Sequence, residues 1–401
     1  MSLNHGFSHL AMPGPTVIPD RVLQAMHRPS PDIYSGELVE GSTALYADLK
    51  RVAKTDADAV IYIGNGHAGW EGALANTLQP GDRVLALYTG RFGRGWASMA
   101  EALGVEVESL DFGEAQPVDP QRVEDALRAD TAHALRAVIT VQTDTSTSVR
   151  NDIAALRAAL DNAGHPALLM VDCIASLGCE PYHMDDWGVD VTVAACQKGL
   201  MTPPGLAFNF IGKRARERRA SLNRVSNYWD WTPRIEGEHF YQKFCGTPPT
   251  HHLFGLREAL DMLHEETIER TWQRHAACAG AVWAAVDAWS QDGPLRLHID
   301  NPAHRSTAVT TVVAGPGNGP RIRQWCIDNV GVTLGFGLPV GEIESARPDN
   351  LFRIGHMGHV TANGLLGSLG SIETALTSLG IDHGAGALEN AAKSLAAAVS
   401  R

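Results

Sequence analysis

The sequence lacks the features that mark membrane, nucleic-acid-binding and disulfide-stabilised proteins. Its six cysteines are scattered over 401 residues without a Cys-x-x-Cys pair, so we expect reduced thiols and a cytoplasmic enzyme. No apolar run is long enough to span a bilayer, and no basic segment followed by an apolar one opens the chain. With 33 Lys and Arg against 45 Asp and Glu, the formal charge is −12 and no basic stripe offers a nucleic-acid surface. We therefore expect neither membrane nor nucleic acid as a partner.

What is present is an alternation of short apolar segments and amphipathic ones. Apolar residues make up 44% of the chain and charged residues 19%, as in ordinary globular proteins, and the length favours two domains. The alternation predicts an α/β fold with a mostly parallel sheet. Strands are expected at residues 59–63, 83–88, 138–142, 167–171 and 188–196, with helices at 70–78 and 152–163.

The pattern changes near residue 254, where longer helices begin. Residues 272–289 form an Ala-rich amphipathic stretch, and a strand is expected at 308–313. We predict a large domain over residues 20–265, a smaller α+β domain over 266–401, and an N-terminal segment, residues 1–19, that packs on the small domain or on a partner subunit.

A lysine and an acid follow two of the predicted strands. Asp172 comes directly after the strand at 167–171, and Lys198 lies just beyond the strand that ends at Cys196. In open α/β sheets the carboxyl ends of the strands carry the functional residues. An amine that forms a Schiff base and an acid that pairs with a pyridine nitrogen are the groups that pyridoxal-phosphate chemistry requires. On position alone, both residues also fit simpler roles as a surface lysine and a helix cap.

A glycine-rich turn follows the first predicted strand. Gly64-Asn-Gly-His-Ala-Gly69 matches the dinucleotide fingerprint and opens a helix, which suggests a nicotinamide-dependent dehydrogenase as one alternative. That fingerprint also needs an acid at the end of the next strand, and the segment from Leu87 to Gly90 has none. The turn still provides backbone N–H groups and a helix N-terminus that suit a phosphate group.

Several separated segments together resemble one family, the class V aminotransferases of pyridoxal-phosphate fold type I. The anchors are Met12-Pro-Gly-Pro-Thr, the glycine turn, Val171-Asp-Cys, Cys196-Gln-Lys-Gly and Phe352-Arg-Ile-Gly, and they occur in the order that the family shows. The resemblance covers nearly the whole chain and is strongest to the alanine–glyoxylate, serine–glyoxylate and pyridoxamine–pyruvate branch. It implies a large domain with a mostly parallel sheet of seven strands and a smaller C-terminal α+β domain.

The resemblance also implies the cofactor, pyridoxal 5′-phosphate, and the residues that hold it. Lys198 matches the Schiff-base lysine that carries the cofactor as an aldimine and moves the proton, and Asp172 matches the partner of the pyridine nitrogen. The implied contacts of the ring and the phosphate are Asn65, Gly66, His67, Phe92, Ser146, Asp172, Ile174, Gln197, Lys198 and Thr247, the last supplied by the partner subunit of a homodimer.

Arg353 matches the arginine that binds the substrate carboxylate, and Gly14 and Thr16 lie near the substrate in the family. One departure concerns the phosphate: the family often has a tyrosine three residues before the threonine that corresponds to Thr247, and this chain has Phe244. Loss of that hydroxyl weakens phosphate binding by roughly 1.5–3 kcal/mol unless another group, such as Tyr241, replaces it.

The expected function is transamination from a small amino acid, serine or alanine, to a small 2-oxo acid, glyoxylate or pyruvate. Pyridoxamine–pyruvate transamination is the alternative within the family. A cysteine desulfurase or lyase would need a cysteine on a mobile loop, and Cys326 lies in a helix-like stretch instead. His356 and His359 have metal-like spacing, but no accompanying acid or cysteine, so no metal is expected.

Overall fold

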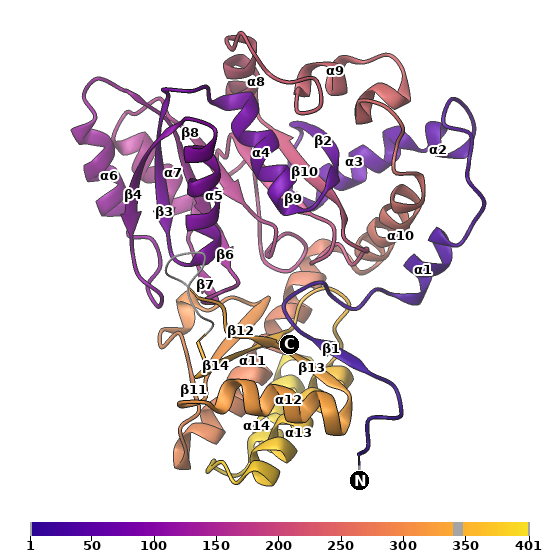
Figure 1. Cartoon of the computed structure of the whole chain (residues 1–401), viewed down its shortest axis with the longest axis vertical. Helices are drawn as coiled ribbons and strands as arrows, with labels where there is room; N and C mark the ends of the chain where they lie inside the picture. Colours follow the sequence, from indigo (N-terminus) through magenta and orange to yellow (C-terminus); the bar gives the residue numbers. More distant parts are fainter. Residues whose placement is uncertain (1, 340–347, 400–401) are drawn as a thin grey trace.

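The computed structural model describes residues 2–339 and 348–399, which fold into two sheets with helices packed around each (Figure 1). The larger sheet has seven strands in the order β2-β10-β9-β8-β5-β3-β4. β10 is antiparallel to both of its neighbours, and all other pairs in this sheet are parallel. These strands are β2 (Asp58–Gly64), β3 (Arg83–Tyr88), β4 (Glu106–Asp111), β5 (Leu135–Val141), β8 (Leu168–Asp172), β9 (Val191–Ala195) and β10 (Gly205–Ile211). The predicted mostly parallel sheet is confirmed.

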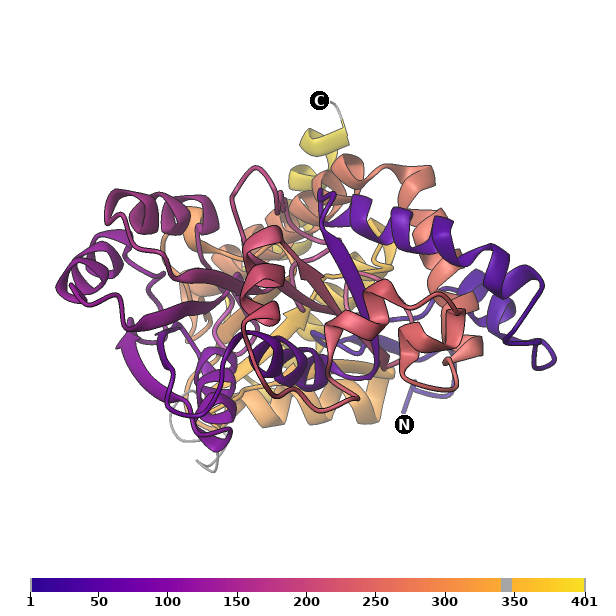
Figure 2. The same ribbon diagram turned by 90° about the horizontal axis from the view of Figure 1, so that it is seen from above.

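The central strands are apolar throughout because helices cover both faces of the sheet. Leu168 and Met170 of β8 pack in one core with α4 and α5, whereas Leu169 and Val171 pack in another with α3, α7 and α10. Figure 2 shows these helical layers on the two sides of the strands. The helices of this half are α1 (Asp20–Met26), α2 (Glu37–Glu40), α3 (Ser42–Val52), α4 (Gly66–Thr77), α5 (Arg91–Ala102), α6 (Pro120–Ala129), α7 (Ile153–Asn162), α8 (Lys213–Ala220), α9 (Trp231–Glu236) and α10 (Thr250–Glu266), with a 3₁₀ turn at Phe240–Phe244.

The smaller sheet has five strands in the order β1-β13-β14-β12-β11. β1 joins it from the start of the chain and pairs in parallel with β13, His9 opposite Val332. In Figure 1 this sheet lies below the larger one, with α11 to α14 packed around it. Its elements are β1 (His9–Ala11), β11 (Arg296–Leu297), β12 (Val309–Val313), β13 (Val332–Phe336), β14 (Leu351–Gly355), α11 (Ile268–Trp289), α12 (Asn318–Val330), α13 (Ala362–Leu379) and α14 (Ala387–Val399), with 3₁₀ turns at Ser290–Asp292 and Pro302–His304.

The two halves meet where the short hairpin of β6 (Thr143–Asp144) and β7 (Val149–Arg150) reaches the small sheet. Val149 forms a bridge to Arg305, and buried Glu180 accepts hydrogen bonds from Ser306 Oγ at 2.5 Å and from Thr143 Oγ1 at 3.0 Å. The predicted start of the small domain at residue 266 coincides with the last residue of α10, and α11 begins at Ile268. In the described part of the chain, no helix combines the length and the hydropathy of a membrane span.

Candidate active site

A pocket of about 280 Å³ lies at the carboxyl ends of the parallel strands, where open α/β sheets place their ligands. Most of the residues predicted for the site meet there, although they come from five separate segments of the sequence. The lining consists of Gly14, Pro15, Asn65, Gly66, His67, Trp70, Phe92, Val141, Thr143, Thr145, Asp172, Ile174, Ala175, Gln197, Lys198 and Pro204. Ser146, Thr16, Arg353 and Thr247 of the predicted set are not part of this lining.

The N-terminal segment packs against Lys198. The Lys198 Nζ donates a hydrogen bond to the carbonyl of Pro13, and Thr16 Oγ1 donates to the carbonyl of Lys198 at 3.1 Å. Gly14 has a positive φ of 90°, and a Cβ there would lie 2.4 Å from the lysine Cδ. Only glycine fits both the backbone conformation and the space beside the lysine. Thr16, although outside the lining, therefore helps to hold the lysine loop.

Burial changes the charge state of this lysine. Removal from water and the nearby Arg353 guanidinium together lower the pKa of Lys198 to about 8, against the opposing effect of Asp172. A lysine with this pKa is partly a neutral amine at physiological pH, and the neutral amine is the form that attacks carbonyl groups.

Asp172 is the last residue of β8 and is 3% exposed. Its Oδ1 accepts a hydrogen bond from the Ile174 N–H at 2.6 Å, and its Oδ2 accepts one from the Trp70 indole Nε1 at 2.8 Å. Burial raises the pKa of Asp172 against the opposing effect of these two hydrogen bonds, with a net value of about 7. The carboxyl group is therefore partly ionised at neutral pH, and a positive charge beside it would favour the ionised form.

The glycine turn forms the start of α4. Asn65 caps this helix, its Oδ1 accepting from the His67 N–H at 3.1 Å. A Cβ on Gly66 would lie 2.3 Å from Ile174 Cδ1, so the turn must pass close to the pocket without a side chain at this position. Burial, together with the Arg91 guanidinium, lowers the pKa of His67. The helix N-terminus and its free positive dipole end suit an anion.

Phe92 is fixed in the pocket wall by a buried carboxylate. Asp144 Oδ2 accepts hydrogen bonds from the N–H groups of Phe92 at 2.8 Å and Gly93 at 3.3 Å, at the start of α5. Its Oδ1 accepts from the Ser146 Oγ at 2.5 Å, and that Oγ accepts from the Arg91 N–H at 2.9 Å. The hydroxyl of Ser146 is thus hydrogen-bonded to Asp144 and to the Arg91 N–H. The neighbouring Thr145 lines the pocket in place of Ser146.

Arg353 lies on β14 and is 6% exposed. Its Nε donates to the carbonyl of Phe336 and its Nη1 to the carbonyl of Thr145, each at 2.7 Å. Burial lowers the pKa of Arg353 to about 10. Within residues 2–339 and 348–399 no carboxylate lies within ion-pair distance of this guanidinium, so Arg353 is a buried cation without a paired anion, close enough to Lys198 to lower the pKa of that lysine.

The remaining predicted residues lie in the 3₁₀ turn at Phe240–Phe244 and just after it. Thr247 is exposed in the single chain. Phe244 is 1% exposed and packs edge-on against Phe240, with ring centroids 5.2 Å apart. Tyr241 is half-buried, and its ring stacks on that of His239 at 5.7 Å.

The topology removes the basis for the dehydrogenase alternative. In a dinucleotide-binding unit the two strands around the glycine turn are parallel neighbours. Here β2 pairs with β10, and four strands separate it from β3, which follows the same helix in sequence. The cysteine desulfurase or lyase alternative also lacks support. Cys326 is buried in α12 of the small domain, and burial raises the pKa of its thiol to about 12.

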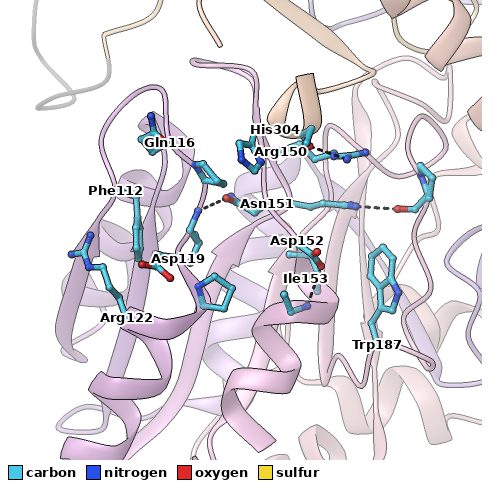
Figure 3. Close-up of a pocket in the computed structure, with 17 residues that line it drawn as sticks. Phe112, Gln116, Asp119, Arg122, Arg150, Asn151, Asp152, Ile153, Trp187 and His304 are labelled. Atoms are coloured by element: carbon cyan, nitrogen blue, oxygen red, sulfur yellow. Dashed lines mark hydrogen bonds between the residues drawn. The ribbon is translucent and has the colours of Figure 1, made fainter. Parts of the chain in front are cut away.

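A larger pocket, about 840 Å³, lies beside β5 and the start of α7 (Figure 3). It contains Gln142, whereas Val141 and Thr143 line the pocket with Lys198, as the alternation of strand side chains requires. Two polar side chains of the larger pocket are hydrogen-bonded within the protein. Gln142 donates to the carbonyl of Pro181 and accepts from the Ser176 hydroxyl, and Asn151 accepts from the Val118 N–H and donates to Thr89 Oγ1 and the carbonyl of Val141.

Sequence reasoning missed several residues of the site. Trp70 lies four residues after Gly66, so helical periodicity places both on the same side of α4, and this signal could have found it. Asp144 begins an Asp-Thr-Ser-Thr-Ser segment, and a short acidic residue at such a place is typical of a turn or helix cap. This pattern could have indicated that its carboxylate accepts hydrogen bonds from nearby backbone N–H groups. For Thr143 and Thr145 we find no sequence signal.

Known proteins resemble this chain over most of its length. Residues 9–342 match the family model described as aminotransferase class-V. The chain is 37% identical over 385 residues to the serine–glyoxylate aminotransferase of Methylorubrum extorquens, an alignment that covers 94% of this chain and 92% of the relative. It is 34% identical to the L-aspartate–glyoxylate aminotransferase of Paracoccus denitrificans, with 92% and 91% of the two chains covered.

Among solved structures, the pyridoxamine–pyruvate aminotransferase of Mesorhizobium loti superposes with a TM-score of 0.88 at 25% identity, covering 98% of each chain. The predicted fold, type I of the pyridoxal-phosphate enzymes, is confirmed. The match of the family model and the extent of these similarities establish the family. The chain belongs to the class V aminotransferases.

Proposed function

We propose that this protein is a pyridoxal-phosphate-dependent aminotransferase that transfers the amino group of serine or alanine to glyoxylate or pyruvate. The observation that carries the proposal is the meeting of half-buried Lys198 and buried Asp172 in one pocket, where burial lowers the pKa of the lysine to about 8 and raises that of the acid to about 7. Relatives that use glyoxylate, at 37% and 34% identity, support the choice of acceptor.

The residues of the pocket fit the cofactor. Asn65, Gly66 and His67 at the start of α4 would hold the phosphate together with the side-chain amide N–H groups of Gln197, which lines the same pocket. Phe92 and Ile174 would pack on the ring, and Asp172 would bind the pyridine nitrogen. When bound, the cofactor supplies a carbonyl carbon that takes up the amino group and a ring that accepts electrons.

The proton transfer, the ring nitrogen and the substrate carboxylate are each assigned to one residue. Lys198 Nζ, as the neutral amine, would take the proton from the Cα of the amino acid and hold it for return to the cofactor. Asp172 would favour a protonated ring nitrogen. Arg353 binds the substrate carboxylate through its remaining N–H groups, and the N-terminal segment around Gly14 limits the space for the side chain.

We also propose that the enzyme is a cytoplasmic homodimer in which Thr247 contacts the phosphate bound by the partner subunit. In the single chain Thr247 is exposed. Large apolar side chains are exposed as well, among them Phe7 at 89% and Tyr34 at 73%, and a dimer interface would bury such residues. The six cysteines are all free, which is consistent with a reducing compartment.

The test is a screen of single half-reactions. The purified protein, loaded with pyridoxal phosphate, is mixed separately with serine, alanine, aspartate, cysteine and pyridoxamine, and the visible absorbance of the cofactor is followed. We expect it to bleach with serine or alanine and to return with glyoxylate or pyruvate. Bleaching by pyridoxamine alone would favour the pyridoxamine–pyruvate reaction, which the similarity to the Mesorhizobium loti enzyme and the Phe244 substitution support. Release of sulfide from cysteine without transamination would overturn the proposal.

The depressed pKa of Lys198 predicts how fast the cofactor-free protein captures pyridoxal phosphate at different pH values. Only the neutral amine condenses with the carbonyl, and with a pKa of about 8 roughly 10% of Lys198 is neutral at pH 7, against about 0.03% of an ordinary lysine. The capture rate, measured by borohydride trapping, should rise about tenfold per pH unit up to pH 7 and become constant above pH 9. A rate that keeps rising to pH 10 would show that burial leaves this lysine unchanged.

A further inference from the structure

Trp70 makes a single polar contact, and it is with the acid of the site. The indole Nε1 donates to Asp172 Oδ2 at 2.8 Å, and both side chains are buried, at 1% and 3% exposure. Trp70 is in the second turn of α4, the helix whose first residues form the glycine turn of the pocket. One rigid helix therefore connects the predicted phosphate end of the pocket to the acid on β8.

The orientation of the indole is set by the rings around it. Trp96 of α5 stacks on it with centroids 6.1 Å apart and an interplanar angle of 14°. Phe92 meets it edge-on at 6.4 Å, and His67 lies at 4.6 Å. Because these neighbours confine the ring on several sides, the N–H is held in the direction of Asp172.

The carboxylate of Asp172 is held at both oxygens. The Ile174 N–H fixes Oδ1 and the Trp70 N–H fixes Oδ2, so rotation of the carboxyl group would break at least one of two short hydrogen bonds. Each carboxylate oxygen still has a lone pair for another donor. Both bonds also favour the ionised form, because a carboxylate accepts more strongly than a carboxylic acid.

We propose that Trp70 is a positioning residue that favours the ionised form of Asp172 and holds its carboxyl group in one orientation before the cofactor arrives. The consequence for cofactor binding rests on the function proposed above. An acid that is already charged and oriented pairs with a protonated ring nitrogen without reorganisation, which strengthens binding.

Other charged groups near Asp172 act in both directions. Lys198, on the loop after β9, favours ionisation of Asp172, whereas the Asp144 carboxylate on β6 opposes it. Cys173, the next residue, is a buried thiol whose pKa lies well above its usual value, so it stays neutral. His67 on α4 has a lowered pKa and is also neutral at physiological pH. Removal of the indole N–H leaves these groups in place, so its own contribution can be measured.

The experiment compares Trp70→Phe with Trp96→Phe in the cofactor-free protein. Trp96 is a suitable control because it is equally buried and stacked on Trp70, yet its Nε1 has no hydrogen-bond partner. The carboxyl carbon of Asp172 is followed by NMR of ¹³C-aspartate-labelled protein over pH 5–10, with Asp172→Asn to assign the signal. We expect the midpoint of the titration to rise by about one pH unit or more in Trp70→Phe and to stay unchanged in Trp96→Phe.

A second readout is the dissociation constant of pyridoxal phosphate. For a midpoint that rises by one unit from about 7, it should be about threefold higher at pH 7.5 for Trp70→Phe than for the wild type. The difference should shrink at pH 9.5, where Asp172 is ionised in both proteins. If Trp70→Phe fails to fold, Trp70 is replaced by 3-benzothienylalanine, which keeps the shape of indole and lacks the N–H.

Equal midpoints in the wild type and in the variant that lacks the N–H would overturn the inference. So would an affinity loss that is the same at both pH values, because this would show a packing effect only. These results are independent of the transamination assay: a shifted midpoint in a protein that fails to transaminate would refute the proposed function and leave the role of Trp70 intact.

Discussion

Replacing Lys198 by alanine is expected to lower turnover of serine and glyoxylate by roughly three to four powers of ten. The reason is that the Nζ is the group that both holds the cofactor and moves the proton, and no other lysine lines the pocket. Turnover is measured by hydroxypyruvate or glycine formation, and covalent attachment by mass spectrometry after borohydride reduction. We expect wild-type protein to gain the mass of the cofactor and Lys198→Ala to gain none.

Lys213→Ala is the matched control for this experiment. Lys213 is at the start of α8, and its side chain is 89% exposed, so its removal should leave turnover and covalent attachment unchanged. Full turnover in Lys198→Ala would refute the assignment of the lysine and, with it, the proposed mechanism.

Replacing Arg353 by alanine is expected to lower kcat/KM for both the amino acid and the 2-oxo acid by about 100-fold or more, mainly through KM. A bidentate bond between a buried guanidinium and a carboxylate contributes roughly 3 kcal/mol, which corresponds to this factor. Arg353→Lys should recover only part of the loss, because an ammonium cannot form the planar fork.

A test substrate without a carboxylate separates binding from structure. Half-reactions with ethylamine, although slow, should be equally fast in the wild type and in Arg353→Ala, whereas those with alanine should differ. Arg323→Ala is the control, because Arg323 lies near the same Phe336 ring and donates to the carbonyl of Leu334 on the adjacent strand. If the variant lost its activity toward ethylamine and alanine alike, the role of Arg353 would be structural.

The sequence predicted the parts of the site that follow buried strands. β8 and β9 are short and apolar because both of their faces are covered, and such segments are visible without a structure. Asp172 and Lys198 come at or just after their ends, so the sheet edge that joins them could be inferred. The glycine turn was likewise visible, because it stands between a strand and a helix.

The direction of β10 and the choice of which side chain lines the pocket were harder to infer from the sequence. β10 was not predicted, and it runs antiparallel to β9. The connection between them, residues 196–204, is too short for the helical crossover of a parallel pair, so its length was a usable signal. Ser146 could not be distinguished from Thr145, because which of two adjacent residues lines a pocket depends on the geometry of the β6–β7 turn and on the buried carboxylate of Asp144.

The pairing of β1 with β13 has a consequence for when, during translation, the pocket around Lys198 can be completed. His9 of β1 lies opposite Val332 of β13. The N-terminal residues that pack against Lys198 are therefore synthesised first, whereas the strand that β1 pairs with is synthesised almost last. At translation rates of about 5–20 residues per second, roughly 15 to 65 s separate the two. During that interval the seven-stranded sheet can form on the ribosome, but the wall around Gly14 cannot close over the lysine. A nascent chain should therefore hold the amine open to solvent until translation is nearly complete.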